Sequence, residues 1–318
     1  MSRVTFQKSI NIVLASPRGF CAGVDRAITI VEKALENYGS PIYVQHEIVH
    51  NKHVVMRLQN NGVIFVDDVG QIPEGSHVIY SAHGVSPEVR KRSKKLNLKV
   101  LDATCPLVTK VHGEAKRYAQ KDHIIILIGH QNHVEVKGTV GEAPERIIVV
   151  GSVEEVANLN VPDENKVAYI TQTTLSLDDT AKIIQALKKR YPKIKGPPKA
   201  DICYATQNRQ NAVKALSKKV DLVLVVGAQN SSNSLRLLEV AKTTGVNARR
   251  IESATEFKKE WLDGVGNLGI TAGASAPENV IQNIVKEINK YSPINDISTL
   301  EIVREDVTFA LPSVLRNV

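Results

Sequence analysis

The chain has 318 residues, with 41 Lys and Arg against 33 Asp and Glu, so its formal net charge is +8 and its pI is about 9.2. Hydrophobic residues make up 42%, which excludes a disordered chain and, at this length, predicts more than one domain around a substantial core. The basic charge favours an acidic partner or substrate, although it can also serve solubility alone.

The three cysteines, Cys21, Cys105 and Cys203, lie far apart and cannot all pair within one chain. A disulfide scaffold is therefore not expected, and a reducing cytoplasm fits better. The first 16 residues lack the layout of a signal peptide. The most apolar runs, such as 124–129 and 222–228, are too short to span a bilayer, so we expect a cytoplasmic protein without a membrane partner.

Short apolar runs rich in β-branched residues alternate with helix-like segments along the chain. The predicted strands are Asn11–Ala15, Pro41–Val44, His77–Tyr80, Val100–Leu101, Ile124–Ile128, Val167–Ile170, Leu222–Val226 and Leu268–Thr271. The predicted helices are Asp25–Tyr38, Pro87–Leu96, Leu107–Gln120, Ser176–Arg190, Gln207–Lys219 and Pro277–Tyr291. This alternation predicts an α/β protein whose mainly parallel sheets carry helices on both faces.

The cysteines mark a repeat. A polar cluster that ends an apolar run follows each cysteine at the same offset of 25 residues, at His46, His130 and Ala228. A second polar loop follows a later strand in each third, at 81–86, 171–176 and 271–276. Since open α/β sheets bind ligands at the carboxyl ends of their strands, each third would present one thiol and two polar loops.

The repeat predicts three similar units with boundaries near the cysteines and near the linker-like stretch 195–199. The expected units are 22–105, 106–199 and 200–295, the last together with 1–21, followed by a tail at 296–318 that packs back on the body. If the units surround a common axis, the three thiols converge.

Four interpretations of the cysteines compete. A buried cysteine is often only a small apolar residue. A catalytic thiol works with a nearby base and does not explain three repeated positions. A structural zinc site usually has four ligands in paired local spacings, which are absent here. The fourth is a [4Fe-4S] cluster with three thiolate ligands, which leaves one iron open to bind substrate as a Lewis acid.

The polar loops favour an anionic ligand. They contain many neutral hydrogen-bonding groups but few Arg or Lys, which suits a phosphate or diphosphate. There is no Walker loop and no G-x-G-x-x-G motif, so nucleotide binding lacks its usual signature. We expect two of the five loop histidines to be structural. The loop residues are His46, His50, His83, His130, His133, Thr173, Thr174, Ser231, Ser232, Asn233 and Ser275.

Glu135 ends the string His130-Gln131-Asn132-His133-Val134-Glu135, which resembles a metal-binding string. Its spacing does not match the H-E-x-x-H zinc site, and we predict a loop because a strand precedes it. We favour Glu135 as a proton donor, since a carboxyl group near a phosphate and a cluster should have a raised pKa. The alternative is a solvated surface glutamate.

The strongest basic run is Arg90-Lys91-Arg92 with Lys94-Lys95 on a predicted helix. It fits a solvated helix face, or a docking surface for an acidic electron-transfer protein.

Seven ordered motifs, within a match from about residue 11 to residue 309, together resemble the IspH (LytB) family of 4-hydroxy-3-methylbut-2-enyl diphosphate reductases. These motifs are PRGFCAGV (17–24), HEIVHN (46–51), SAHGVS (81–86), DATCPLV (102–108), TQTTLS (171–176), DICYAT (201–206) and SSNS (231–234).

The resemblance implies three α/β units in a pseudo-threefold trefoil around a central [4Fe-4S] cluster, one per chain. Cys21, Cys105 and Cys203 would be its ligands, with one iron lacking a protein ligand. Glu135, Thr173 and His133 would form the catalytic group. The substrate's diphosphate and hydroxyl would be held by His50, His83, His133, Thr173, Ser231, Ser232, Asn233 and Ser275.

The reaction implied by the resemblance is the last step of the methylerythritol phosphate route. The open iron would bind the allylic hydroxyl, and two electrons would enter one at a time from reduced ferredoxin or flavodoxin. Protonation through Glu135 would release the hydroxyl as water. A second proton at either end of the allyl species would give isopentenyl or dimethylallyl diphosphate.

Two other functions remain open on the residues alone. A non-catalytic RNA-binding protein would use the basic surface, although aromatic residues make up only 4% and leave few rings for base stacking. A zinc hydrolase would carry zinc. We expect no nucleic-acid partner.

Overall fold

The computed structural model describes residues 9–316. Residues 1–8 of the expected third unit and 317–318 of the expected tail lie outside the described residues. The chain forms two compact units. The terminal unit contains Met1–Cys21 and Tyr204–Val307, and the middle unit contains Ala22–Cys203 and Thr308–Val318.

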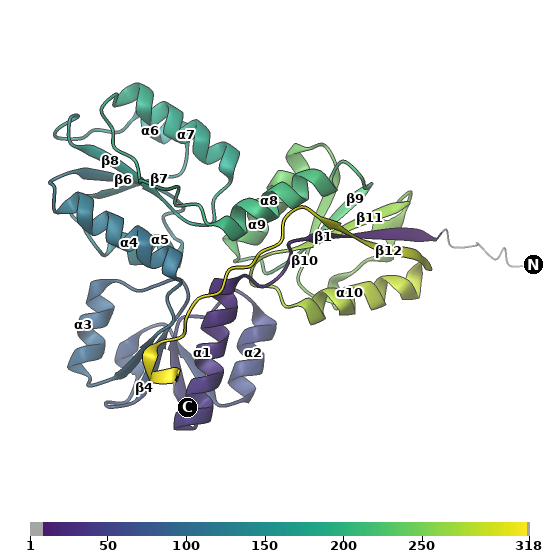
Figure 1. The fold of residues 1–318 in the computed structure, drawn as a ribbon, viewed down its shortest axis with the longest axis horizontal. Helices are drawn as coiled ribbons and strands as arrows, with labels where there is room; N and C mark the ends of the chain where they lie inside the picture. Colours follow the sequence, from purple (N-terminus) through teal and green to yellow (C-terminus); the bar gives the residue numbers. More distant parts are fainter. Residues whose placement is uncertain (1–8, 317–318) are drawn as a thin grey trace, which may run out of the picture. The chain divides into compact units, whose positions relative to one another are not determined.

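The terminal unit is built on one parallel five-stranded sheet with the order β10-β9-β11-β1-β12. Strand β1, from the beginning of the described chain, therefore lies between two strands from its last third (Figure 1). The strands are β1 (Ile10–Ser16), β9 (Leu222–Val226), β10 (Asn247–Ile251), β11 (Asn267–Ala272) and β12 (Ile294–Glu301).

Helices cover both faces of this sheet: α8 (Tyr204–Leu216) and α9 (Ser232–Thr243) on one, and α10 (Glu278–Tyr291) on the other (Figure 1). Alternation along β9 explains the arrangement. Leu222, Leu224 and Val226 pack with α10, whereas Val223 and Val225 pack with α8 and α9. Because all five side chains are buried, the strand reads as one continuous apolar run.

The middle unit contains two further parallel sheets, with the orders β3-β2-β4-β5 and β7-β6-β8. The strands are β2 (Ile42–Gln45), β3 (Val63–Val66), β4 (His77–Tyr80), β5 (Lys99–Asp102), β6 (Ile124–Ile128), β7 (Ile147–Val150) and β8 (Val167–Thr171).

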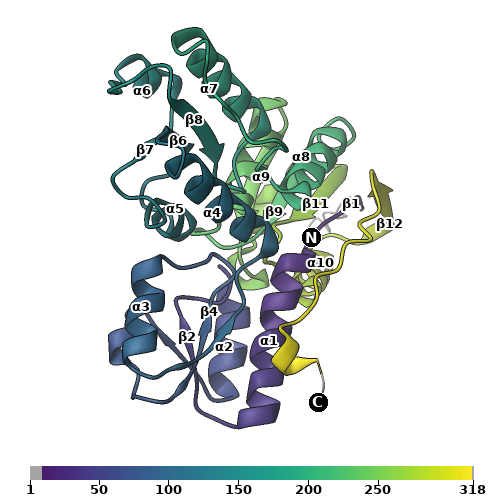
Figure 2. The same cartoon turned by 60° about the vertical axis from the view of Figure 1, so that its left-hand side comes forward.

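Helices also cover both faces of these two sheets. Figure 2 shows α1 and α3 on opposite sides of the four-stranded sheet. In β6, Ile126 and Ile128 pack against α7, and Ile125 and Leu127 against α4. The helices are α1 (Ala22–Tyr38), α2 (Lys52–Asn60), α3 (Pro87–Lys95), α4 (Pro106–Ala119), α5 (Val134–Val140), α6 (Val153–Ala157) and α7 (Leu177–Arg190).

Four short 3-10 helices complete the described elements: η1 (Val69–Gln71), η2 (Ala254–Glu256), η3 (Lys259–Leu262) and η4 (Ser313–Leu315). Within residues 9–316, no helix has the length and apolar character needed to cross a membrane.

Three parallel sheets with flanking helices confirm the predicted fold class. Their arrangement around a central cluster and the boundaries of three separate units stay predictions. The linker-like stretch runs beside β8, because the Lys195 N–H donates to Val167 O (3.0 Å) and the Tyr169 N–H donates to Lys195 O (2.8 Å).

Candidate active site

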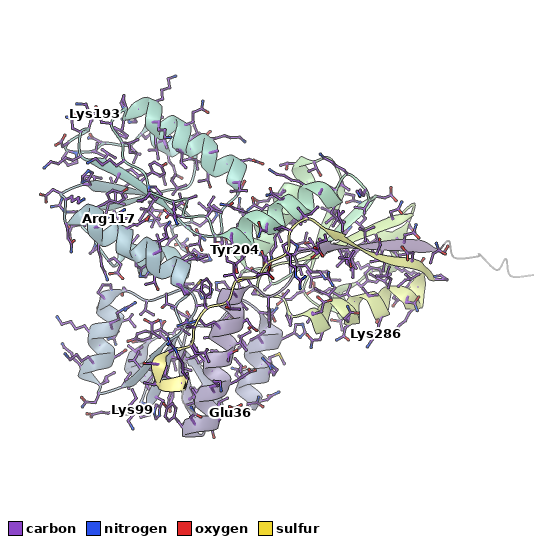
Figure 3. The ribbon with its side chains drawn as sticks, in the orientation of Figure 1. Glu36, Lys99, Arg117, Lys193, Tyr204 and Lys286 are labelled. Atoms are coloured by element: carbon purple, nitrogen blue, oxygen red, sulfur yellow. The ribbon has the colours of Figure 1, made fainter. Side chains whose placement is uncertain are left out.

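Each cysteine lies directly before a helix: α1 begins after Cys21, α4 after Cys105, and α8 after Cys203. Figure 3 labels Tyr204, the first residue of α8. None of the three is in a disulfide, and all are partly accessible. The positive end of a helix dipole favours the charged thiolate form. The predicted position between a strand and a helix is therefore confirmed for Cys105, the N-cap of α4.

The backbone of every cysteine is tied to one of the repeated polar loops. The N–H of Cys105 donates to Ala82 O (3.0 Å). In the same way, Cys203 donates to Thr173 O (3.0 Å) and Cys21 donates to Ala274 O (3.3 Å). The repeat seen in the sequence thus corresponds to one repeated contact, which places the backbone of each cysteine beside one of the polar loops.

The turn before Cys21 requires a glycine. Gly19 has φ +67, and a Cβ built on it would lie 3.0 Å from Ala276 O. A side chain there would be strained by the backbone and by the neighbouring carbonyl. The chain can therefore approach the 271–276 loop closely only through this glycine.

Glu135 is a buried carboxyl group, 3% exposed, in the first turn of α5. Its Oε1 accepts from the Thr173 N–H (2.7 Å) and its Oε2 from the Thr173 hydroxyl (3.0 Å). Burial raises the pKa of Glu135 to about 7, opposed by the two Thr173 hydrogen bonds and reinforced by Asp201. Such a group holds a proton near neutral pH and can release it, as a general acid must.

Three of the predicted histidines form one cluster. The His50 and His83 rings stack with centroids 4.2 Å apart. The His133 ring meets both edge-on, at 5.5 Å from His50 and 6.1 Å from His83. Desolvation by burial, with a smaller contribution from the neighbouring imidazoles, lowers the pKa of both rings. The pKa of His83 lies well below its ordinary value, and the pKa of His133 is about 4. Both rings are therefore neutral at pH 7.

The hydrogen bonds of His133 select its tautomer. Its Nδ1 accepts from the Glu135 N–H (3.2 Å), where His133 is the N-cap of α5. Because the ring is neutral and Nδ1 is the acceptor, Nε2 carries the proton and can donate it in a hydrogen bond to an anion.

In the terminal unit, the first turn of α9 gathers the predicted Ser231, Ser232 and Asn233, all buried. The Ser231 hydroxyl accepts from the Ser234 N–H (3.4 Å) and the Ser234 hydroxyl (3.0 Å). Asn233 is 5% exposed, and neither polar atom of its amide has a hydrogen-bond partner among the described residues. A buried amide without partners at a helix N-terminus fits an anion that would satisfy it.

Helix α9 can start so close to the ends of strands β9 and β11 only because a glycine follows each of these two strands. A Cβ on Gly227 or on Gly273 would lie 2.1 Å from the Ser234 hydroxyl oxygen. Real Cβ atoms do not approach an oxygen this closely, so the close packing of α9 against the ends of the two strands depends on both glycines. Ser275, also buried, follows Gly273 in the same loop.

Three of the five loop histidines cluster; that two of the five are structural stays a prediction. The His46 ring pairs instead with Asp67 (2.9 Å). The His130 backbone N–H donates to Gln172 Oε1 (3.1 Å). The interpretation of Glu135 as part of a loop is wrong: it lies in α5, whose N-cap is His133, whereas a solvated glutamate is excluded by its burial.

The basic run on α3 is partly neutralised. Arg92 pairs with Asp68 (3.0 Å) and Arg90 with Asp102 (3.6 Å). The cations at the end of the helix also complement its dipole. These contacts favour the solvated, stabilising face over a docking surface.

Within residues 9–316, no three His, Cys, Asp or Glu side chains lie together as a metal site. The donor set nevertheless fits an iron–sulfur cluster chemically. All three cysteines lie outside disulfides at helix N-termini, and each has its backbone anchored by a loop.

Sequence reasoning missed three cationic side chains that bind the backbone before the cysteines: Arg26, Lys110 and Arg209. Their repeated offset from the cysteines was an available signal, since Arg26 and Lys110 each lie five residues after one.

Comparisons with known proteins identify the family of the chain. Residues 12–289 match the model of the LytB protein family. The 4-hydroxy-3-methylbut-2-enyl diphosphate reductase of Actinobacillus pleuropneumoniae serotype 3 is 53% identical over 310 residues, which cover 96% of this chain and 98% of the relative. The enzyme of the same name from Nocardia farcinica is 52% identical over 307 residues, which cover 96% and 91%.

Solved structures agree as well. The E-1-hydroxy-2-methyl-but-2-enyl-4-diphosphate reductase from Plasmodium falciparum superposes with a TM-score of 0.93 at 42% identity, covering 96% of this chain and 97% of that one. An (E)-4-hydroxy-3-methyl-but-2-enyl diphosphate reductase gives a TM-score of 0.63 at 34% identity, covering 88% and 99%. The family match spans most of the chain, and the chain belongs to the LytB family of 4-hydroxy-3-methylbut-2-enyl diphosphate reductases.

Proposed function

We propose that this chain reduces (E)-4-hydroxy-3-methylbut-2-enyl diphosphate to isopentenyl diphosphate and dimethylallyl diphosphate, the last step of the methylerythritol phosphate route. Family membership gives the reaction class. The observation that carries the proposal is the buried Glu135 carboxyl, whose pKa is about 7 and whose partner Thr173 accepts the Cys203 N–H.

Cys21, Cys105 and Cys203 would hold one [4Fe-4S] cluster, with one iron lacking a protein ligand. When bound, such a cluster supplies electrons one at a time and an open iron that acts as a Lewis acid.

The diphosphate is held by neutral donors in this proposal. His133 donates from Nε2, and the stacked His50 and His83 add further imidazole groups. Asn233 gains partners for an amide that has none among the described residues. Ser231, Ser232 and Ser275 add hydroxyl groups. Many short hydrogen bonds to the diphosphate oxygens fix the carbon chain without requiring a lysine or arginine.

Proton transfer belongs to Glu135 and Thr173. The Thr173 hydroxyl oxygen lies 3.0 Å from Glu135 Oε2, so it can accept the proton of the neutral carboxylic acid while it donates its own proton to the substrate's terminal hydroxyl. Two electrons and two protons balance the reaction: the C–O bond breaks, the hydroxyl leaves as water, and the second proton forms the new C–H bond at either end of the allyl group.

Reduced ferredoxin or flavodoxin would deliver the electrons. Both are acidic proteins, and the net charge of +8 supports association with such a donor. The absence of disulfides at the three described cysteines supports a cytoplasmic location.

Metal analysis combined with a turnover assay tests this function. The anaerobically purified chain should contain about four irons and four sulfides and should consume the allylic diphosphate when reduced chemically. A protein with zinc in place of iron would support a hydrolase. A colourless protein whose main activity is salt-dependent RNA binding would support the RNA-binding alternative and overturn the reductase.

A further inference from the structure

Three cations outside the reacting groups bind the backbone that leads into the cysteines. The first is Arg26 on α1, five residues after Cys21. Its Nη1 donates to Thr104 O (3.2 Å) and its Nη2 to Asp102 O (3.4 Å), directly before Cys105. Its Nε donates to Ala310 O (2.8 Å), which joins the C-terminal segment to the same site.

The second cation is Lys110 on α4, five residues after Cys105. Its Nζ donates to Lys199 O (2.8 Å) and Ala200 O (3.1 Å) and pairs with Asp201 Oδ1 (2.8 Å). All three partners lie within four residues before the next cysteine. The Lys110 side chain is 29% exposed, and that of Asp201 is fully covered.

The third cation is Arg209 on α8, six residues after Cys203. It is fully buried. Its Nη2 donates to Gly19 O (2.8 Å) and Phe20 O (3.3 Å), the two residues before Cys21. Its Nη1 pairs with Glu305 Oε1 (3.1 Å), so the guanidinium charge is compensated.

These contacts form a cyclic pattern along the chain. The helix after each cysteine carries a cation five or six residues beyond that cysteine, and this cation binds the backbone before the next cysteine, with the last returning to the first. These backbone partners are 76 to 190 residues away in sequence, so local helix or turn formation does not explain the contacts.

We propose that Arg26, Lys110 and Arg209 are equivalent positioning residues, each of which fixes one thiolate-bearing loop through hydrogen bonds donated by a cationic group. The proposal rests on the cysteine ligation proposed above. Groups behind the ligands of a metal centre orient them, and hydrogen bonds and charge set cluster potentials. A cation there offsets the negative charge of the thiolates and favours the reduced cluster.

The test compares charge-removing variants with matched controls in the full chain carrying a reconstituted cluster. Arg26→Gln and Lys110→Gln should each release iron to a chelator about tenfold faster than the wild type. Their midpoint potentials, followed by electron paramagnetic resonance, should move to lower values. Lys110→Arg should restore both properties, and Arg26→Lys should restore the potential.

The matched controls are Lys33→Gln on α1 and Arg117→Gln on α4, each seven residues after the tested cation. Arg117, labelled in Figure 3, is exposed. Its guanidinium lies over the Tyr118 ring. Both controls should match the wild type. Thermal unfolding of the cluster-free proteins shows whether each variant folds.

The proposal is overturned if folded Arg26→Gln and Lys110→Gln release iron at the wild-type rate and keep the wild-type midpoint potential. It is also overturned if the control variants release iron as fast as the Gln variants and show the same lowered potential. If either Gln variant fails to fold, the variants that keep the charge, Lys110→Arg and Arg26→Lys, decide the question. An unchanged midpoint potential of the cluster in these variants supports the charge effect, and a lowered midpoint potential refutes it. A wild-type chain that holds no cluster would instead refute the proposed cysteine ligation, and this proposal with it.

Discussion

Thr173 donates two hydrogen bonds to the Glu135 carboxylate, from its N–H at 2.7 Å and from its hydroxyl at 3.0 Å. Both favour the charged carboxylate, whereas burial favours the neutral acid and prevails, since the pKa of Glu135 rises to about 7. The pair therefore holds a proton that is available at neutral pH.

Glu135→Gln removes that proton but keeps the size of the side chain. Turnover should fall by about a hundredfold or more, because general-acid catalysis contributes on that scale. Affinity for the substrate should change little. Steady-state kinetics and equilibrium binding check this, with the exposed Glu145→Gln as the control. Undiminished turnover would show that Glu135 is not the proton donor.

Thr173→Val tests the pH dependence. With its pKa at about 7, Glu135 is protonated below that value, so kcat should be level at lower pH and fall as pH rises above it. Losing the hydroxyl removes the proposed proton relay, so kcat should be lower at every pH. It also removes a hydrogen bond to the charged carboxylate and raises the pKa of Glu135 further, so the fall in the remaining kcat should move to higher pH. Thr173→Ser should keep the wild-type profile. An unmoved profile in Thr173→Val contradicts this account.

Asn233→Leu separates binding from stability. The buried amide has no hydrogen-bond partner among the described residues, so its removal should stabilise the chain by about 1 kcal/mol. Affinity for inorganic pyrophosphate should fall about tenfold or more. Ser234→Ala, which loses its bond to Ser231, should instead destabilise the chain. Unchanged pyrophosphate affinity in Asn233→Leu would argue against a diphosphate site on α9.

The histidine cluster predicts a loss of stability in acid. Burial lowers the pKa of His133 from its ordinary value of 6.5 to about 4 in the folded chain. Below pH 6.5 the unfolded chain binds a proton that the folded chain excludes, so stability falls as pH falls towards 4. From pH 7.5 to 5 the wild type should lose about 2 kcal/mol relative to His133→Gln. Urea unfolding at both pH values measures this, with the exposed His53→Gln as control. Parallel stability curves would contradict it.

Cys203→Ser should abolish most activity and lower the iron and sulfide content, since a serine hydroxyl is a poor substitute for a thiolate. Cys21→Ser and Cys105→Ser should behave alike. Iron and sulfide analysis of anaerobic preparations, together with turnover, measures the effect. A fully active Cys203→Ser enzyme would end the cluster assignment.

The strands that the sequence predicts well are buried on both faces. Strands β6 and β9 are continuous apolar runs, and their observed bounds equal the predicted ones. Strand β12 was not predicted because it lies at the sheet edge and most of its side chains are exposed and polar. Its place beside β1 depends on a pairing between opposite ends of the chain.

Helix α5 was missed for a different reason. Its residues, Val134–Val140, include β-branched side chains and a glycine, which are weak helix formers. A histidine serves as N-cap in place of the more usual serine or aspartate. Tertiary packing therefore decides this helix, and it is what buries Glu135.

The offset of Arg26, Lys110 and Arg209 from the cysteines is visible in the sequence, but their contacts are not, because their partners are distant backbone carbonyls that any residue type carries. The association of each cysteine with a polar loop was predictable from the repeated offset, since each repeat retains the same order of thiol and loop.

Product analysis in deuterated water tests the reductase assignment most directly. The anaerobic, cluster-loaded chain, given reductant and the allylic diphosphate, should yield isopentenyl and dimethylallyl diphosphates. Each product should lack the hydroxyl and carry one solvent deuteron on carbon, because the second proton forms the new C–H bond. A chain with full iron and sulfide content that leaves the substrate unchanged, or whose product retains the hydroxyl, would contradict the account.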